Sequence, residues 1–109
     1  MKVSELIEKL NLEIVTNRDF TDRDVTGCYI GDLLSWVMGK AQQNDAWITI
    51  MNNINIVAVA SLTDCACIIL CEGVSAPENV IQKANAEEII ILKSEDDAYR
   101  LALKLGEEI

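Results

Sequence analysis

The stretch AWITIMNNINIVAVASLTDCACIIL, residues 46–70, decides the fold of this chain. It opens with the apolar run AWITIM at 46–51 and closes with CACIIL at 65–70, and a third run, EIIILK, follows at 88–93. The runs recur at about the length of one βα unit, which predicts neighbouring parallel strands. Because the connection between parallel strands must cross over the sheet and is usually helical, we predict a buried helix over 54–63, although its β-branched residues favour strand locally.

Helix signals surround these runs. Ser75 and Glu78 have the spacing of a capping box with Pro77 in the first turn of the helix. Ser94 and Asp97 have the same spacing after the third run. Upstream we predict a helix with Leu6, Ile7 and Leu10 on one face, a strand at 12–16, and a helix at 32–40 with Leu33, Leu34, Val37 and Met38 on one side. The prediction is a single α/β domain over residues 1–109, with three layers and a mostly parallel central sheet flanked by helices.

The charge and composition of the chain argue against several classes of function. The 109 residues carry a net charge of -9 and no cluster of Lys or Arg, which argues against a nucleic-acid partner. Asn residues interrupt the longest nearly uncharged stretch, 46–63, so we expect no membrane span. The N-terminus lacks the apolar core of a signal peptide, and we expect a cytoplasmic protein. The chain has no His, the commonest general base and metal ligand.

Three cysteines offer one alternative function. Cys65, Cys67 and Cys71 share one parity on a predicted strand, and three thiols on one face would suit a redox or metal accessory protein. However, ligands on an extended strand are spaced about 6.5–7 Å per residue pair, which suits a chelate poorly. Free Cys in an apolar run typically behaves as a small hydrophobe. We therefore predict structural cysteines, with no metal and no cofactor.

Catalytic signatures are weak. No Ser or Cys has a His to activate it, the chain has no P-loop, and GCYIGD at 27–32 lacks the glycine pattern of a dinucleotide fingerprint. We expect no enzyme. A remaining alternative is an enzyme acting on a phosphorylated substrate, which requires the loop at 22–32 to form a pocket of positive potential.

The most specific motif is DRDVTGCYIGDLLSWVM at residues 22–38. Together with AWITIMNNINIVAVA at 46–60 and AEEIIIL at 86–92, it resembles the DRTGG domain family. The Asp-Arg-Thr-Gly-Gly pattern of the family name is met loosely at Asp22, Arg23, Thr26 and Gly27, whereas Cys28 stands where the second Gly would be. The resemblance covers nearly the whole chain, from Met1 to Leu105.

The resemblance implies a regulatory or assembly module with no established catalytic activity. Domains of this family occur alone, and also inside larger proteins, between nucleotide-sensing CBS domains of some pyrophosphatases and in certain phosphotransacetylases. Their fold is similar to the N-terminal domain of a bacterial carrier-protein serine kinase. We expect a homodimer that binds an unidentified protein partner or a small anionic, nucleotide-like effector. Family members often carry Gln and His before the Asn-Ile-Val segment, where this chain has Met51 and Asn53.

The candidate ligand-binding residues each have a structural alternative. Arg23 would contact an anion or pair with Asp22 and Asp24. Thr26 and Gly27 would form an anion-binding turn or a plain turn, and Asp32 would be a site carboxylate or the cap of the following helix. Beyond the carboxyl ends of the strands, where open α/β sheets bind ligands, the candidates are Ser35, Thr49, Asn53 and Asn55.

Two further side-chain types complete the expectations. Trp36 and Trp47 are predicted to be core or interface aromatics. Cys28 would strain or block the loop if its position required a positive φ or a close approach to a ligand.

Overall fold

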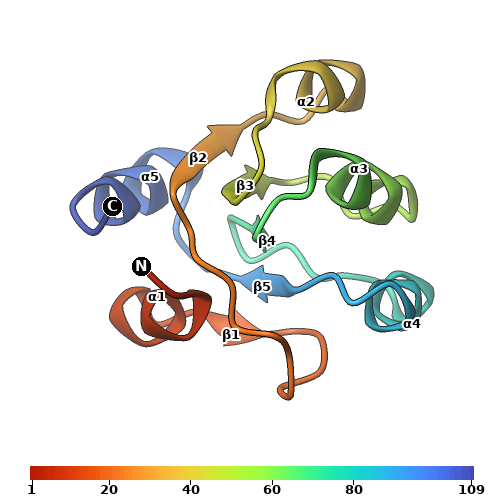
Figure 1. Ribbon diagram of the computed structural model, residues 1–109, viewed down its shortest axis with the longest axis horizontal. Helices are drawn as coiled ribbons and strands as arrows, with labels where there is room; N and C mark the ends of the chain where they lie inside the picture. The colour runs from red at the N-terminus through yellow and green to blue at the C-terminus, as the bar shows by residue number, and fades with distance from the viewer.

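The computed structural model describes residues 1–109 as an α/β fold. The elements in chain order are α1 (Val3–Leu10), β1 (Glu13–Ile14), β2 (Gly27–Ile30), α2 (Leu34–Lys40), β3 (Asp45–Thr49), α3 (Asn55–Thr63), β4 (Cys67–Leu70), α4 (Glu78–Ala86), β5 (Ile91–Lys93) and α5 (Ala98–Gly106). Figure 1 shows three layers, with α1 and α5 on one face of the sheet and α2, α3 and α4 on the other. The predicted fold class is confirmed.

The sheet has the strand order β1-β5-β4-β3-β2. Strands β2 to β5 run parallel, and only β1 is antiparallel to its neighbour β5. The three apolar runs form β3, β4 and β5, and the crossover segment forms α3, so these predictions are confirmed. None of the helices is long and apolar enough to cross a membrane.

The core lies on both faces of the sheet. Every residue of β3 and β4 is buried, as expected of parallel strands covered by helices on both sides. One cluster, under α1 and α5, includes Val3, Leu6 and Leu101, and the other, under α2 to α4, includes Trp47 and Ile56. Trp47 is therefore a core aromatic, as predicted.

The predicted capping boxes are wrong in detail. Helix α4 begins after Pro77, which is its N-cap without a side-chain bond, and the hydroxyl of Ser75 instead accepts a hydrogen bond from Lys93 Nζ at 3.1 Å. Helix α5 is capped by Asp97, whose carboxylate accepts from the backbone N–H of Arg100 at 2.8 Å. Local spacing located these two helices but not the residues that begin them.

The segment between β1 and β3 differs most from expectation. Gly27, predicted to lie in a turn, begins strand β2, which pairs in parallel with β3 from Gly27 opposite Asp45 onward. Helix α2 begins at Leu34 rather than at residue 32, and Asp32 does not cap it. Leu33 and Met38 are exposed instead of packing on the core beside Val37.

Candidate functional site

The candidate residues lie at two opposite ends of the sheet. Arg23, Thr26 and Gly27 lie at the amino ends of the parallel strands, because they precede or begin β2. The other candidates lie at or beyond the carboxyl ends of β2 and β3: Asp32, Ser35, Thr49, Asn53 and Asn55. The structure therefore does not bring the eight residues into one site.

Arg23 donates hydrogen bonds within the protein through both terminal nitrogens of its guanidinium. Its guanidinium donates to the Asp64 carboxylate at 2.9 Å, to the carbonyls of Asp64 and Cys65 at 2.9 and 3.1 Å, and to Asn44 Oδ1 at 2.5 Å. Asp64 is the C-cap of α3, so Arg23 satisfies carbonyls at a helix end that have no partner within the helix. Of the two alternatives for Arg23, internal pairing is observed, but with Asp64 rather than with its sequence neighbours.

Asp22 holds the other end of the same loop. Its carboxylate accepts from the backbone N–H of Ser4 at 3.0 Å and from the Ser4 hydroxyl at 2.5 Å, in the first turn of α1. Partial burial alone would raise the pKa of Asp22, but the two hydrogen bonds from Ser4 and the charge of Lys2 outweigh it and lower that pKa. Asp22 therefore caps a helix that is remote in sequence.

Gly27 is required by the space that Asp45 occupies. A Cβ built on Gly27 would lie 2.5 Å from Asp45 Oδ1. The Asp45 side chain is buried and accepts from the backbone N–H of Gln42 at 2.8 Å, which fixes the turn before β3. Thr26 is exposed, and its backbone N–H donates to the Asn44 carbonyl at 3.0 Å. Each of these residues thus joins the β1–β2 segment to the start of β3.

Cys28 fits its position without backbone strain. It lies in β2, has no positive φ and packs against the cluster under α1 and α5. Burial, followed by the nearby Asp45 carboxylate, raises the pKa of its thiol to about 11. The position does not require a positive φ, so that condition for strain at Cys28 is not met.

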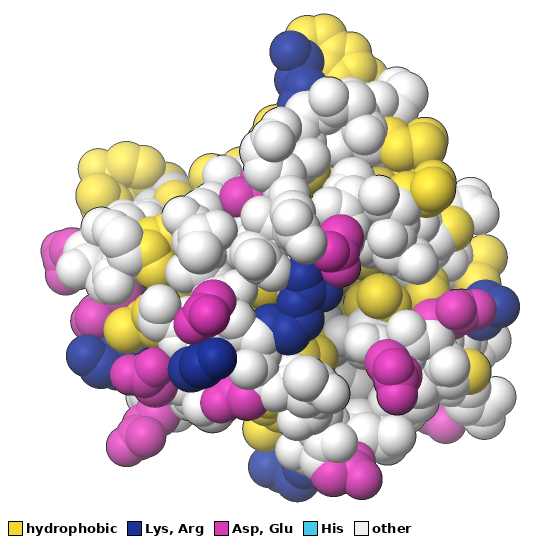
Figure 2. All heavy atoms as spheres, viewed as in Figure 1, with side chains coloured by type: hydrophobic (Ala, Val, Ile, Leu, Met, Phe, Trp, Pro, Cys, Tyr) yellow, Lys and Arg dark blue, Asp and Glu magenta, His cyan; other side chains and the backbone are white.

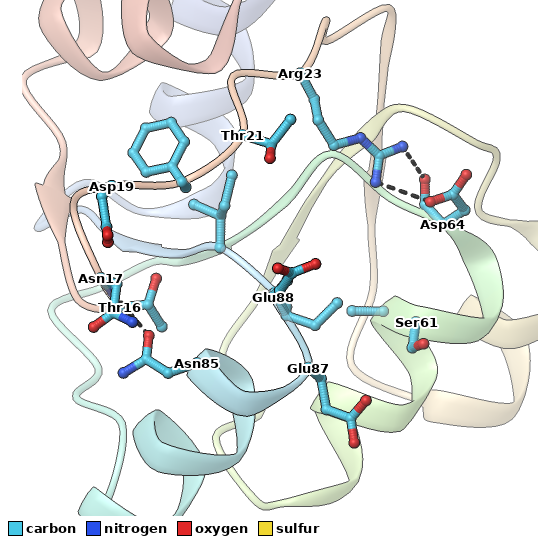
Figure 3. Close-up of a pocket in the computed structure, with 14 residues that line it drawn as sticks. Thr16, Asn17, Asp19, Thr21, Arg23, Ser61, Asp64, Asn85, Glu87 and Glu88 are labelled. Carbon is cyan, nitrogen blue, oxygen red and sulfur yellow. Dashed lines mark hydrogen bonds and ion pairs between the residues drawn. The ribbon is translucent and has the colours of Figure 1, made fainter.

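A cleft of about 500 Å³ opens beside Arg23 at the amino ends of the strands (Figure 3). Three segments that are far apart in the sequence line it: residues 16–23, the end of α3, and residues 85–90, which include the end of α4. Its polar lining residues are Thr16, Asn17, Asp19, Thr21, Arg23, Ser61, Asp64, Asn85, Glu87 and Glu88. Sequence reasoning identified only Arg23 among them, because no short motif links the three segments.

The electrostatics of the cleft disfavour an anion. Arg23 is the only Lys or Arg in its lining, against the carboxylates of Asp19, Asp64, Glu87 and Glu88. In Figure 3 the Glu88 carboxylate lies near the middle of the cleft. The carboxyl ends of α3 and α4 also border it, and these ends carry partial negative charge. Its polar lining suits neutral or cationic groups better than phosphates.

The residues at the carboxyl ends of the strands also bind one another. Asp32 Oδ1 accepts from the Thr49 hydroxyl at 2.8 Å and from the backbone N–H of Ile50 at 3.0 Å, which joins the chain after β2 to the chain after β3. Asn53 Oδ1 accepts from the backbone N–H of Asn55 at 2.9 Å, at the start of α3. Asp32 was predicted as a helix cap, and the structure gives it a bridging role instead. Ser35 is exposed on α2.

The cysteines do not share one face. Cys67 and Cys71 belong to the cluster under α1 and α5, whereas Cys65 belongs to the opposite cluster. Cys65 precedes β4, so its side chain does not follow the alternation of side chains between the two faces of the sheet that begins at Cys67. All three are buried. Burial raises the pKa of each thiol, to about 11 for Cys65. No group of three or more Cys, Asp or Glu side chains is placed to hold a metal ion.

Comparisons with known proteins add two findings. A family model described as the DRTGG domain matches residues 5–107. A crystal structure of the CBS and DRTGG domains of the regulatory region of Clostridium perfringens pyrophosphatase, complexed with the activator diadenosine tetraphosphate, is similar in fold, with a TM-score of 0.72 at 12% identity. The match covers 94% of this chain and 45% of that chain. No curated protein matches the sequence.

Proposed function

This chain belongs to the DRTGG domain family, and on that premise we propose that it is a non-catalytic, cytoplasmic regulatory or assembly module that works through contacts with protein. The partners include a second copy of the chain. The proposal goes beyond family membership in assigning the work to protein contacts rather than to an anionic ligand.

The contacts that the signature residues make within the chain support this proposal. Asp22 caps α1, Arg23 donates four hydrogen bonds to main-chain and side-chain acceptors, and Gly27 makes room for Asp45. A phosphate bound at this loop would have to displace internal partners of Arg23 in a cleft lined by four carboxylates. The signature therefore supports a role in building the fold.

The absence of an activated nucleophile supports a non-catalytic module. The chain has no His, and its buried thiols have raised pKa values, so they remain protonated at neutral pH. Buried protonated thiols also count against the redox or metal accessory protein. Four unpaired cysteines fit the reducing conditions of the cytoplasm.

Thermal unfolding in the presence of phosphate compounds tests the proposal. We expect no saturable stabilisation by diadenosine tetraphosphate, ATP or inorganic phosphate. A compound present at a hundred times its dissociation constant would raise the unfolding free energy by about 2.7 kcal/mol, which such a measurement detects. Saturable stabilisation by any of the three would contradict a module that works through protein contacts alone.

A small anionic effector is the second candidate, and one observation favours it. The similar regulatory region from Clostridium perfringens was crystallised with the activator diadenosine tetraphosphate. If an anion binds in the cleft beside Arg23, Glu88→Lys should tighten its binding, because the change adds positive charge to the lining. Glu107→Lys, with the same charge change on the exposed C-cap of α5, is the matched control and should have little effect.

A further inference from the structure

Strand β2 forms an open edge of the sheet. It pairs with β3 on one side and with no strand on the other. The opposite edge is β1, which has two residues, one of them the charged Glu13. Strand β2 has the sequence GCYI, and of the usual protections of an edge it has only its short length, with no Lys, Pro or inward charge. Its backbone is therefore available to pair with another strand.

Large apolar side chains gather on both helices beside this edge. We call the following set the open margin: Ile30 in β2, Leu33 and Trp36 at and in α2, and Tyr99 and Leu103 in α5, with exposed fractions of 49, 62, 59, 71 and 51%. Figure 1 places β2 between α2 and α5, which lie on opposite faces of the sheet. In Figure 2 hydrophobic side chains protrude over both helices.

The α5 residues of the open margin lie on the side of the helix turned away from α1. Glu108, just after α5, pairs with Lys9 of α1, which identifies the side of α5 that faces α1. Tyr99 and Leu103, at i and i+4, form a stripe on the other side, since successive helix residues turn by about 100°. Because α5 contacts β2 and β3, the side away from α1 is the side of the free edge.

Charge is low over the β2 and α2 part of the open margin. The chain carries a net charge of -9, so two copies repel each other over most of their surfaces. The segment 25–44, which contains β2 and α2, has only Asp32 and Lys40 as charged residues and is neutral overall. Lys40 lies over the Trp36 ring, 5.2 Å from its centroid. Two copies that meet at β2 and α2 therefore bring little like charge together there.

We propose that a second copy of this chain docks on the open margin, with the two β2 strands antiparallel in one continuous sheet. A two-fold axis perpendicular to the sheet keeps each face on its own side, so α2 meets α2 and α5 meets α5 of the other copy. Each helix thus brings its exposed apolar residues against their own counterparts. The inference rests on the proposed function, because it specifies which surface makes the protein contact.

The available area is consistent with a dimer. The five side chains of the open margin offer roughly 500 Å² of accessible surface, if an aromatic side chain contributes about 150–250 Å² when fully exposed. A standard interface buries about 800 Å² per partner, polar rim included. The backbone of β2 and the polar residues around α2 supply the remainder.

Sedimentation velocity across a wide dilution series tests the assembly. We expect a wild-type dimer, and at least a tenfold weaker dissociation constant for Leu33→Glu and for Leu103→Glu, which lie on opposite faces of the sheet. Leu62→Glu is the matched control, because Leu62 is 72% exposed on α3, away from the open margin, and its dimer should be as tight as wild type. Far-UV circular dichroism of each variant checks that it folds.

Hydrogen exchange tests the strand pairing itself. We expect amides of residues 27–30 to exchange more slowly in the dimer than in the diluted monomer. Any one of three results would overturn the proposal: a monomeric wild type, a dimer that is as tight in both Glu variants as in wild type, or exchange of the β2 amides that does not change on dilution. A monomer that also binds no phosphate compound removes the second copy as a partner but leaves a regulatory module that works through contacts with another protein. A dimer that binds a phosphate compound contradicts only the proposed function.

Discussion

The loop with the family signature and the open margin, which begins only a few residues later at Ile30, differ in how their side chains are used. In the loop, Asp22 and Arg23 have partners within the chain, and Gly27 leaves only the space that Asp45 fills. In the open margin, Trp36 and Tyr99 are mostly exposed. Satisfied polar groups hold a fold together, whereas exposed apolar groups gain free energy only by meeting a partner.

This difference separates two kinds of mutation. A change in the loop should lower the free energy of unfolding and leave the open margin intact once the chain folds. A change in the open margin should alter association and leave the stability of the monomer nearly unchanged. The following predictions test that separation, from the largest expected effect to the smallest.

Arg23→Met should have the largest effect on stability. It removes the guanidinium donors to Asn44 Oδ1, to Asp64 and to the carbonyl of buried Cys65. We expect a loss of about 2–4 kcal/mol in the free energy of unfolding, measured by urea denaturation. Arg23→Lys should recover only part of it, because an ammonium group cannot reproduce the planar fork of donors.

The matched control is Arg18→Met, at an exposed Arg for which no hydrogen bond or ion pair is observed. Its effect should lie within about 0.5 kcal/mol of wild type. Equal losses of unfolding free energy at the two positions would contradict a specific stabilising role for the hydrogen bonds of Arg23.

Gly27→Ala and Gly39→Ala should change stability in opposite directions. At Gly27 the added methyl group collides with Asp45 Oδ1, and the loss should be about 1–3 kcal/mol. Gly39 lies in α2 with nothing within 4 Å of its Cβ position, so Ala there should add about 0.5–1 kcal/mol by lowering the entropy of the unfolded chain. Thermal denaturation of both variants measures the difference, and the same sign at both positions would contradict the steric explanation.

The central fold could be predicted from the sequence because burial leaves a local pattern. Strands β3 to β5 are mostly apolar, and α3 is the crossover between two of them, so length and composition indicate both. Strand β2 could not be predicted in this way. It is a short edge strand whose pairing with β3 is fixed by residues 18 positions apart, such as Gly27 and Asp45.

The candidate site was less predictable than the fold. The roles of Arg23 and Asp32 depend on partners from other elements, Asp64 and Thr49, that no local spacing reveals. The cleft joins three separate segments, and most of its lining residues are common polar types. Within the motif at 22–38, Asp22, Arg23 and Gly27 build the fold, whereas the exposed apolar side chains of Ile30, Leu33 and Trp36 come later in it.

Asp22→Ala should cost about 1 kcal/mol at neutral pH, because α1 loses its remote cap. The pKa of Asp22 is lowered in the folded chain, so its contribution is complete above the unfolded-state value of about 3.9 and is lost as the pH falls through the folded value. The difference between wild type and variant should therefore shrink below about pH 4, as urea denaturation across pH measures. Asp24→Ala is the control, since its pair with Lys2 is about half exposed and worth little at any pH.

Trp36→Gln should have the smallest effect on the monomer. At a protein concentration where wild type is monomeric, we expect a change within about 0.5 kcal/mol, because the ring is 59% exposed and its only specific contact is with Lys40. At higher concentration the wild-type midpoint of urea unfolding should rise, since association stabilises the folded state by mass action, and the midpoint of the variant should rise less. If dilute Trp36→Gln lost as much free energy of unfolding as Gly27→Ala does, Trp36 would support the fold. The contrast between the two regions would then be wrong.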